Sequence, residues 1–403
     1  MFQSGMAKRP RVGLHRIWSY GQIILCRKSH ENHNRSSSNS WRKWVCKRIP
    51  RGKTNERCEN YSNLRRHFRN SKNHNLKKIV KIMKSKTKQF LKDTGATTPV
   101  ICGPMYPGSN PELIAAVSEA GGFGVVQPVA LTSLYGHDFR EGLKLIKKLT
   151  KKPFGVNFTI FGGANKKYHN QMKEWMDISI EEGIKFFLTS LGKPHEIVKI
   201  AKKNGIKVYH DVPNKKVALA MVDCGVDGLN CINWRAGGQT GIQSAEKFIE
   251  ELEGIKIPLV CAGGIGNRED YDKVLEMGYA GVQLGTRFLA SKECIVTDSY
   301  KKAIVDSEEK DIVWTNKVAG NNSSVIKTND IMRGGLRTGA IINFMLKRPK
   351  LKKYARMYLM SKGLKNYSKT AFDDNVQFWQ AGKGVGGIKS IESCEDILNE
   401  YKI

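Results

Sequence analysis

Two short apolar segments that end in glycine place the strongest constraint on how this chain can fold. The segment 258–262 runs into Gly263–Gly264, and the segment 281–284 runs into Gly285–Thr286. Between them, apolar residues at helical spacing predict one helix. Glycines at strand ends let backbone N–H groups approach an anion closely, and (β/α)8 barrels bind phosphate in this way after their seventh and eighth strands. The pattern therefore predicts an enzyme that holds a phosphorylated ligand, most simply a cofactor.

The same alternation extends upstream, because short apolar segments alternate with helix-like ones from about residue 94. Pro111 and Pro194 suit the first turns of two such helices, and Gly205 and Gly225 suit helix ends. Alternating units of this number favour an α/β fold, a (β/α)8 TIM barrel, over an open doubly wound sheet. The eight strands are predicted at residues 100–102, 124–126, 154–158, 186–189, 207–210, 228–231, 258–262 and 281–284.

The formal net charge of +31 is concentrated at the start of the chain, where residues 1–82 carry 21 Lys or Arg against 3 Glu. This segment has almost no periodicity, so we expect a disordered or non-native head, such as translated sequence ahead of a start at Met83. A transit peptide and a nucleic-acid-binding arm stay open as alternatives. The rest is predicted to form a barrel at 83–294, a small helical cap at 295–375 and a C-terminal segment, 376–403, that returns to the barrel.

Nine cysteines show neither a zinc-site spacing nor a disulfide framework, so we expect reduced thiols, a cytoplasmic protein and no metal. The sequence has no apolar run of about 18 residues, so we expect no membrane span.

The chemistry of such a barrel lies at the carboxyl ends of its strands, and here those ends are rich in apolar, amide and glycine residues. Pro104–Met105 follow the first strand, Asn157 lies in the third, Asp211 ends the fifth and Gly237–Gly238 follow the sixth. Paired carboxylates and metal-ligand clusters are not evident, which argues against a hydrolase. Flat apolar side chains, amide donors and a phosphate grip suit flavin mononucleotide, FMN.

Six motifs follow one another in order along the predicted barrel. They lie at residues 99–105, 111–124, 155–158, 236–241, 262–265 and 285–288, and a shorter glycine-rich segment follows at 381–388. In order and spacing they resemble the nitronate monooxygenase family (the 2-nitropropane dioxygenase group), which is related to the type II enoyl-ACP reductases. The resemblance covers about residues 95–292 and implies an FMN-dependent barrel oxidoreductase.

The resemblance also implies roles for single residues. The backbone at Pro104–Met105 would lie against the flavin ring, Asn157 would hydrogen-bond its polar edge, and the glycine pairs would surround the phosphate. The expected cofactor-binding residues are Pro104, Met105, Asn157, Asp211, Gly237, Gly238, Gly263, Gly264, Gly285 and Thr286.

Several positions depart from the family pattern. Gln239 stands where the family usually has a histidine, and it is the expected catalytic residue. Its amide can hydrogen-bond a nitro or carbonyl oxygen but cannot act as a general base. A nitronate is already an anion and needs no such base, whereas a neutral nitroalkane does. Arg235 stands where an acidic residue is usual, Lys383 replaces a frequent glutamine, and 319–326 lacks a Gly-x-Pro-x-Arg pattern. Arg235 fits either the attraction of an anionic substrate or a surface salt bridge.

Two oxidoreductase functions stay open. The first is oxidation of alkyl nitronates by dioxygen; the alternative is an NAD(P)H-dependent flavin reductase, such as an enoyl-ACP or quinone reductase. A non-redox phosphate-binding isomerase or aldolase is a rival of another class, for which only Lys193 fits loosely as the catalytic lysine. His210 is the one histidine worth testing at the site. The expected partners are a small-molecule substrate (a nitronate, or an enoyl or quinone acceptor) and dioxygen, and no membrane partner is expected. A homo-oligomer stays open, and a nucleic-acid partner is disfavoured.

Overall fold

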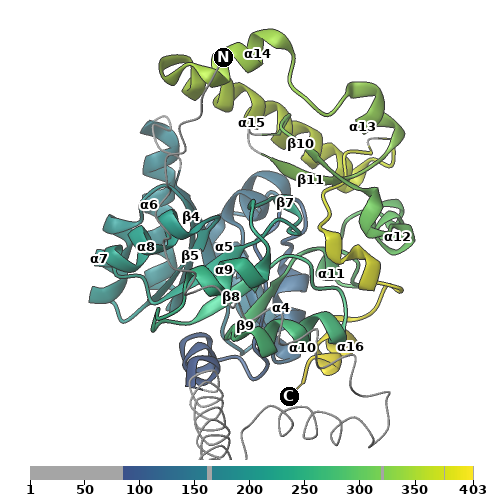
Figure 1. The fold of residues 1–403 in the computed structure, drawn as a ribbon. Helices are drawn as coiled ribbons and strands as arrows, with labels where there is room; N and C mark the ends of the chain where they lie inside the picture. Colours follow the sequence, from purple (N-terminus) through teal and green to yellow (C-terminus); the bar gives the residue numbers. More distant parts are fainter. Residues whose placement is uncertain (1–84, 161–165, 319–321, 376, 403) are drawn as a thin grey trace, which may run out of the picture. The chain divides into compact units, whose positions relative to one another are not determined.

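The computed structural model describes residues 85–160, 166–318, 322–375 and 377–402, all within one compact unit, Lys77–Ile403 (Figure 1). The predicted basic head and Met83 lie outside the described residues. Eight parallel strands form a closed barrel in the order β1-β2-β3-β4-β5-β6-β8-β9, which confirms the predicted (β/α)8 fold. The strands are β1 (Val100–Cys102), β2 (Phe123–Val126), β3 (Gly155–Ile160), β4 (Phe186–Leu191), β5 (Lys207–Val212), β6 (Gly228–Ile232), β8 (Leu259–Ala262) and β9 (Gly281–Leu284).

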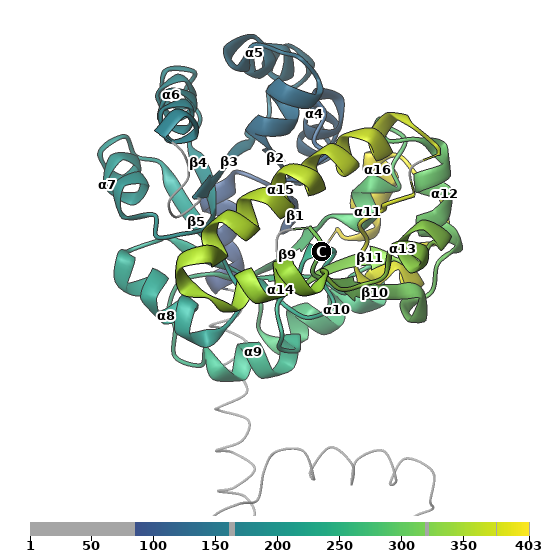
Figure 2. The same ribbon diagram turned by 90° about the horizontal axis from the view of Figure 1, so that it is seen from above.

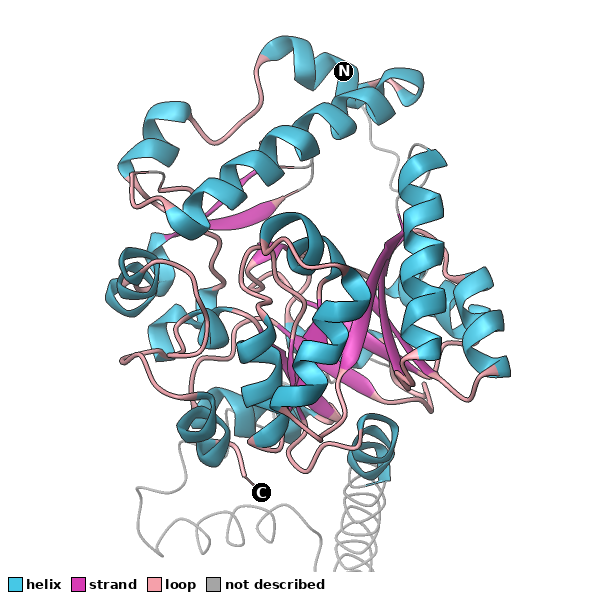
Figure 3. Ribbon diagram, turned by 180° about the vertical axis from the view of Figure 1, so that it is seen from behind, coloured by secondary structure: helices cyan, strands magenta, loops and turns pink. Residues whose placement is uncertain are grey.

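Helices cover the outside of the barrel (Figure 3), and local signals set their ends. Asn214 caps the helix 215–224, because its side chain accepts from the Val217 N–H at 3.0 Å, and Gly225 ends that helix with φ 81°. Pro194 precedes its helix as the N-cap instead of lying in the first turn. The barrel helices are α4 (Pro111–Glu119), α5 (Phe139–Leu149), α6 (Lys166–Glu181), α7 (His195–Lys203), α8 (Lys215–Cys224), α9 (Ala245–Glu251), α10 (Arg268–Met277) and α11 (Thr286–Leu289).

The barrel interior holds its own apolar cluster, built from every second residue of the strands. Its members include Ile101, Phe123, Val125, Phe186, Leu188, Tyr209 and Val260. Residues 85–94, which are helical, add Phe90 to this cluster. Phe90 is fully buried, its ring lies edge-on to Tyr209, and the Tyr209 hydroxyl donates to Asp93 at 3.0 Å. The helix 85–94 therefore closes one end of the barrel.

The chain continues past the barrel into a segment that crosses the opposite end (Figure 2). This segment also contains two strands, β10 and β11, in a part of the chain for which helices were predicted. They form an antiparallel sheet with β7 (Gly238–Gln239), in the order β10-β11-β7. The elements are α12 (Asp298–Asp306), η2 (Glu309–Asp311), β10 (Ile312–Thr315), β11 (Ser323–Ile326), α13 (Asn329–Gly334), α14 (Ala340–Lys347), α15 (Pro349–Phe372), η3 (Lys383–Gly387) and α16 (Cys394–Glu400).

Among the described residues, none of the helices has the length and apolar character needed to cross a bilayer.

Phe90→Ala should lower the free energy of unfolding by about 3–5 kcal/mol, because it leaves a cavity where a buried ring filled the barrel end. Urea unfolding followed by circular dichroism measures the change. Leu149→Ala, at a half-exposed position of α5, is the matched control and should cost less than about 1 kcal/mol. Equal losses of unfolding free energy in the two variants would contradict the conclusion that Phe90 fills the end of the barrel.

Candidate functional site

At the carboxyl ends of the strands, the side chains that face the barrel interior change from apolar to polar. Residues paired across a parallel ladder point to the same face of the sheet. Asn157 pairs with Leu188, and Gln283 pairs with Ile101, both of the interior cluster. Asp211 is two residues beyond Tyr209 and pairs with Asn230. The interior polar layer therefore comprises Asn157, Asp211, Asn230 and Gln283.

Two amide oxygens of this layer have no hydrogen-bond partner among the described residues. Asn230 donates its Nδ2 to Asp211 Oδ1 at 2.6 Å, but its own Oδ1 is buried without a hydrogen bond within the described chain, as is Gln283 Oε1. Leaving such an acceptor unsatisfied costs about 1–3 kcal/mol. Both atoms are therefore ready to accept from the N–H of a bound molecule.

Asn157 is already satisfied by the fold. Its Nδ2 donates to the Leu188 carbonyl at 3.0 Å, and its Oδ1 accepts from the Thr159 hydroxyl at 3.1 Å. Asn157 and Asp211 lie on β3 and β5, with β4 between them. Asn230 and Gln283 are not among the site residues predicted from the sequence, although each is a lone polar residue at an inward position of an otherwise apolar strand.

Neighbouring residues on β5 have opposite titration behaviour. Burial raises the pKa of Asp211 to about 7, although the hydrogen bond from Asn230 acts to lower this pKa. Burial lowers the pKa of His210 to about 4. His210 points away from the barrel interior, because it alternates with Tyr209 and Asp211, and its Nδ1 lies 2.8 Å from Thr189 Oγ1. The structure therefore directs the carboxyl, and not the imidazole, into the barrel.

The glycine pair after β8, Gly263–Gly264, packs against Arg235 and Ala236 in the loop after β6. A Cβ on Gly263 would lie 2.5 Å from the Ala236 nitrogen, and one on Gly264 would lie 2.5 Å from Arg235 Nε. Both also have φ values, 112° and 84°, that side chains rarely adopt. The fold itself therefore requires glycine at these two positions.

The C-terminal segment joins the same cluster. A Cβ on Gly237 would lie 2.8 Å from the Gly382 nitrogen, and Gly382 N–H donates to Thr286 Oγ1 at 2.9 Å. Gly238, with φ 62°, lies in β7 beside this contact. Three predicted glycine segments thus converge, and residues 381–387 pack onto them.

Gly285 differs from the other glycines of the cluster. Its φ is −115°, and the nearest atom to a Cβ built there is Met105 Sδ at 3.5 Å, an ordinary contact. The fold would therefore accept alanine at Gly285. A glycine that neither backbone angle nor packing demands is consistent with the close approach of a ligand.

The loop after β1 brings Pro104–Met105 to this edge. The Met105 N–H donates to Ser109 Oγ at 2.8 Å, so it is already used within the loop. The side chain of Met105, adjacent to Gly285, is what this loop offers to the site.

The expected catalytic residue, Gln239, lies in β7, with Ser323 of β11 as its ladder partner. Its side chain is exposed. The segment 323–326, which is part of the departure from the family pattern at 319–326, therefore fixes the backbone that presents Gln239. Residues 319–321 lie outside the described chain.

The two cations that depart from the family pattern share one carboxylate. Arg235 Nη1 lies 2.8 Å from Glu309 Oε2, and Lys383 Nζ lies 3.5 Å from Glu309 Oε1. Lys383 Nζ also lies 4.6 Å from the centre of the Trp234 ring. Arg235 thus forms a salt bridge that ties the rim after β6 to η2 and the C-terminal segment.

Other candidate groups are not assembled into a site. Lys193 is exposed in the turn before α7, so it lacks the apolar surroundings of a Schiff-base lysine. The described residues contain no group of three or more His, Cys, Asp or Glu that could hold a metal ion.

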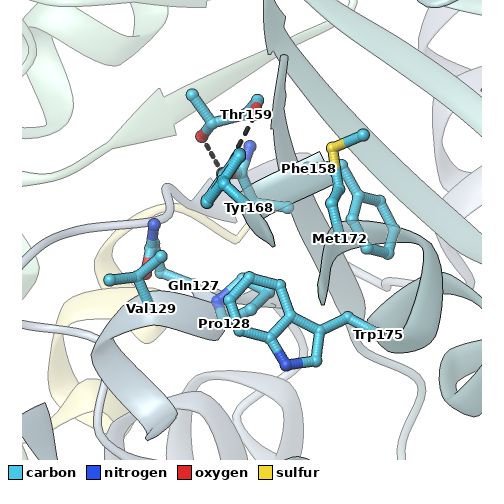
Figure 4. Close-up of a pocket in the computed structure, with 9 residues that line it drawn as sticks. Gln127, Pro128, Val129, Phe158, Thr159, Tyr168, Met172 and Trp175 are labelled. Atoms are coloured by element: carbon cyan, nitrogen blue, oxygen red, sulfur yellow. Dashed lines mark hydrogen bonds between the residues drawn. The ribbon is translucent and has the colours of Figure 1, made fainter. Parts of the chain in front are cut away.

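A small pocket lies outside the barrel, between the end of β3 and α6 (Figure 4). Its volume is about 170 Å³, which includes open solvent at its mouth. This volume is below the roughly 300–1,000 Å³ that is typical of ligand-binding pockets. Trp175, Met172 and Phe158 line it, and the Tyr168 hydroxyl donates to the Thr159 carbonyl at its edge. We therefore place the candidate site at the barrel end and not in this pocket.

The closed barrel and its polar carboxyl end define a (β/α)8-barrel protein with a site where such barrels carry their chemistry. The sequence model of a family described as "Nitronate monooxygenase" matches residues 88–401. The chain therefore belongs to the nitronate monooxygenase family, a family of oxidoreductases.

Relatives of two descriptions resemble the chain. It is 29% identical over 236 residues to the (3aS,4S,5R,7aS)-5-hydroxy-7a-methyl-1-oxo-octahydro-1H-indene-4-carboxyl-CoA dehydrogenase of Rhodococcus jostii, covering 58% of this chain and 64% of that protein. It is 26% identical over 276 residues to a probable nitronate monooxygenase of Staphylococcus saprophyticus, covering 58% of this chain and 76% of that protein.

Two solved structures have the same fold. FabK from Thermotoga maritima matches with a TM-score of 0.64 and 24% identity over 77% of this chain and 93% of that one. Nitroalkane oxidase from Streptomyces ansochromogenes matches with a TM-score of 0.61 and 21% identity over 77% of this chain and 96% of that one.

Asp211→Asn should stabilise the protein relative to wild type by an amount that grows from about pH 4 to about pH 7. The folded pKa is raised, so the folded state keeps a proton that the unfolded chain releases, and wild-type stability falls across this window. One such group contributes a slope of at most about 1.4 kcal/mol per pH unit. Urea unfolding at several pH values measures it.

His210→Gln is the companion variant with the opposite sign. Because the pKa of His210 is depressed, the wild type loses stability as the pH falls from about 6.5 to about 4. The stability of His210→Gln relative to wild type should therefore increase as the pH falls through this range. A stability difference between Asp211→Asn and wild type that does not change with pH would contradict the raised pKa of the Asp211 carboxyl.

Proposed function

We propose that the chain is an FMN-dependent oxidoreductase whose cofactor binds at the carboxyl end of the barrel. The observation that carries the proposal is the interior polar layer, where two buried amide oxygens await donors and no metal-ligand cluster occurs in the described residues. Neutral amides can orient a cofactor but cannot carry electrons, so the redox chemistry must come from a bound group.

The residues present fit FMN. Asn230 Oδ1 or Gln283 Oε1 would accept a hydrogen bond from the flavin ring, the Met105 side chain would offer an apolar contact, and Gly285 would leave room beside the glycine cluster. Pro104, Asn157, Asp211, Gly237, Gly238, Gly263, Gly264 and Thr286 complete the proposed set. When bound, FMN accepts electrons from the substrate and passes them to dioxygen.

The substrate we propose is an alkyl nitronate. Gln239 donates its amide N–H to a nitro oxygen and so orients the anion, while no residue needs to remove a proton from carbon. A substrate that arrives deprotonated is the one an amide at this position can serve.

The second candidate, an NAD(P)H-dependent reductase, is favoured by Asp211. Reduction of a conjugated double bond needs a proton as well as a hydride, and a carboxyl with a pKa of about 7 can hold or release one at neutral pH.

Gly285→Ala should weaken FMN binding at least about tenfold, because a methyl group would fill the space left for the cofactor, while thermal stability stays unchanged. Fluorescence titration of the flavin-stripped protein with FMN measures the affinity. Gly386→Ala is the matched control, since a Cβ there meets nothing within 4 Å. Equal FMN affinity in Gly285→Ala and wild type would exclude this edge as the cofactor site.

The purified protein should be yellow, and without oxygen it should bleach on addition of an alkyl nitronate but not of NADH or NADPH. Gln239→Ala should lower kcat/KM for the nitronate about 10–100-fold, as expected for loss of a hydrogen bond to a charged group. Visible spectra and stopped-flow kinetics measure both effects.

Gln239→His is the informative companion, because it supplies a base and should add turnover of neutral nitroalkanes. Bleaching by NADH or NADPH would favour the reductase instead. A colourless protein that does not take up FMN would reject both flavin functions.

A further inference from the structure

The helix α14 is apolar, but none of its residues is fully buried. Its eight residues include Ile341, Ile342, Phe344, Met345 and Leu346, yet none of the eight is buried. Ile341 is 78% exposed and Phe344 is 53% exposed. A monomer rarely leaves contiguous apolar side chains in water unless another surface covers them.

The helix α15 continues this surface. Leu351, Tyr354 and Tyr358, at helical spacings of three and four, are exposed on one stripe, with Tyr354 at 61%. Ala355 and Leu359 are buried on another side of the helix. We call α14 and α15 together, residues 340–372, the helical hairpin.

The charge of the hairpin has one sign. Residues 340–372 contain nine Lys or Arg and no Asp or Glu. The guanidinium of Arg348 lies 4.9 Å from the centre of the Phe344 ring, so cation and exposed aromatic side chain lie together. Whatever covers the hairpin must therefore offer an apolar interior and negative charge.

The second half of α15 packs on the rest of the chain. The centre of the Phe372 ring lies 6.2 Å from the centre of the Tyr135 ring. Gly363 lies against the Val318 carbonyl, because a Cβ on Gly363 would lie 2.9 Å from that oxygen. Figure 1 shows α14 and the start of α15 at the outer edge of the described chain, beyond the barrel end that carries the candidate site.

We propose that the helical hairpin docks on the surface of an anionic lipid bilayer. Exposed Ile, Phe, Tyr and Met side chains next to lysines are typical of helices that lie in the interface, with the apolar side chains below the headgroups. Anionic headgroups attract the lysines and arginines. A second copy of the chain would bring like charges together, and nucleic acid would not cover Ile341 or Leu351. A peripheral helix of this kind does not span the membrane.

The test is hydrogen–deuterium exchange of the full chain with vesicles of phosphatidylcholine alone, and with roughly one quarter of the lipid replaced by anionic phosphatidylglycerol. Anionic vesicles should slow exchange in residues 340–359, and zwitterionic vesicles should not. In co-sedimentation, Ile341→Ser with Phe344→Ser, and separately Lys350→Glu with Lys352→Glu and Lys353→Glu, should each weaken binding at least about tenfold.

The controls separate the hairpin from the charge of the whole chain. Lys199→Glu with Lys202→Glu and Lys203→Glu changes the net charge equally on exposed α7, and Leu149→Ser with Leu219→Ser removes exposed apolar side chains elsewhere. Both control variants should bind as wild type does.

Three results would overturn the proposal. The first is binding to anionic vesicles that does not slow exchange in residues 340–359. Vesicle binding that the control variants lose as strongly as the hairpin variants do counts as the same result. The second is equal protection by polyglutamate, which offers charge without an apolar interior and would point to an acidic protein. The third is protection that rises with protein concentration in the absence of lipid, which would point to a second copy.

Discussion

The candidate site depends on the two-residue alternation of side chains in a closed parallel barrel. In β5, Tyr209 fills the interior core and Asp211 faces the same interior one layer higher, while His210 between them faces the surrounding helices. A register shift of one residue would put the imidazole inside and the carboxyl outside. The core that stabilises the barrel thus also decides which polar groups a ligand can meet.

Glycine has two separate reasons for being at the barrel end. At Gly263 and Gly264, the backbone angles and the contacts with the loop after β6 exclude a side chain. At Gly285 neither reason holds, because a methyl group would meet only ordinary contacts. A glycine-rich sequence therefore combines positions where the fold requires glycine with positions where it does not, and only the surroundings of each position separate them.

The segment after the barrel links the site to the outer surface. It supplies the strand β11 that pairs with β7, which carries Gln239, and it then forms the helical hairpin. The basic residues of this segment, together with Arg235 of the loop after β6, fall into two groups. Lys383 and Arg235 are neutralised in part by Glu309, whereas the hairpin has no acidic residue of its own. Unbalanced positive charge beside exposed apolar side chains therefore distinguishes the hairpin from the loop after β6 that carries Arg235.

The sequence by itself determined the barrel, because its strands alternate with amphipathic helices at a spacing that one fold satisfies, and each signal is local. Its ordered motifs likewise indicated the family, and they indicated Met105 and the glycine pairs as residues of one edge. Only the tertiary structure decided that the amide oxygens of Asn230 and Gln283 lack hydrogen-bond partners within the described residues, because such partners come from residues distant in the chain. It also decided that Arg235 meets Glu309, that β11 supports Gln239, and that α14, apolar enough for a core, remains outside it. Periodicity shows which face of an element is apolar, but only the packed chain shows whether anything covers that face.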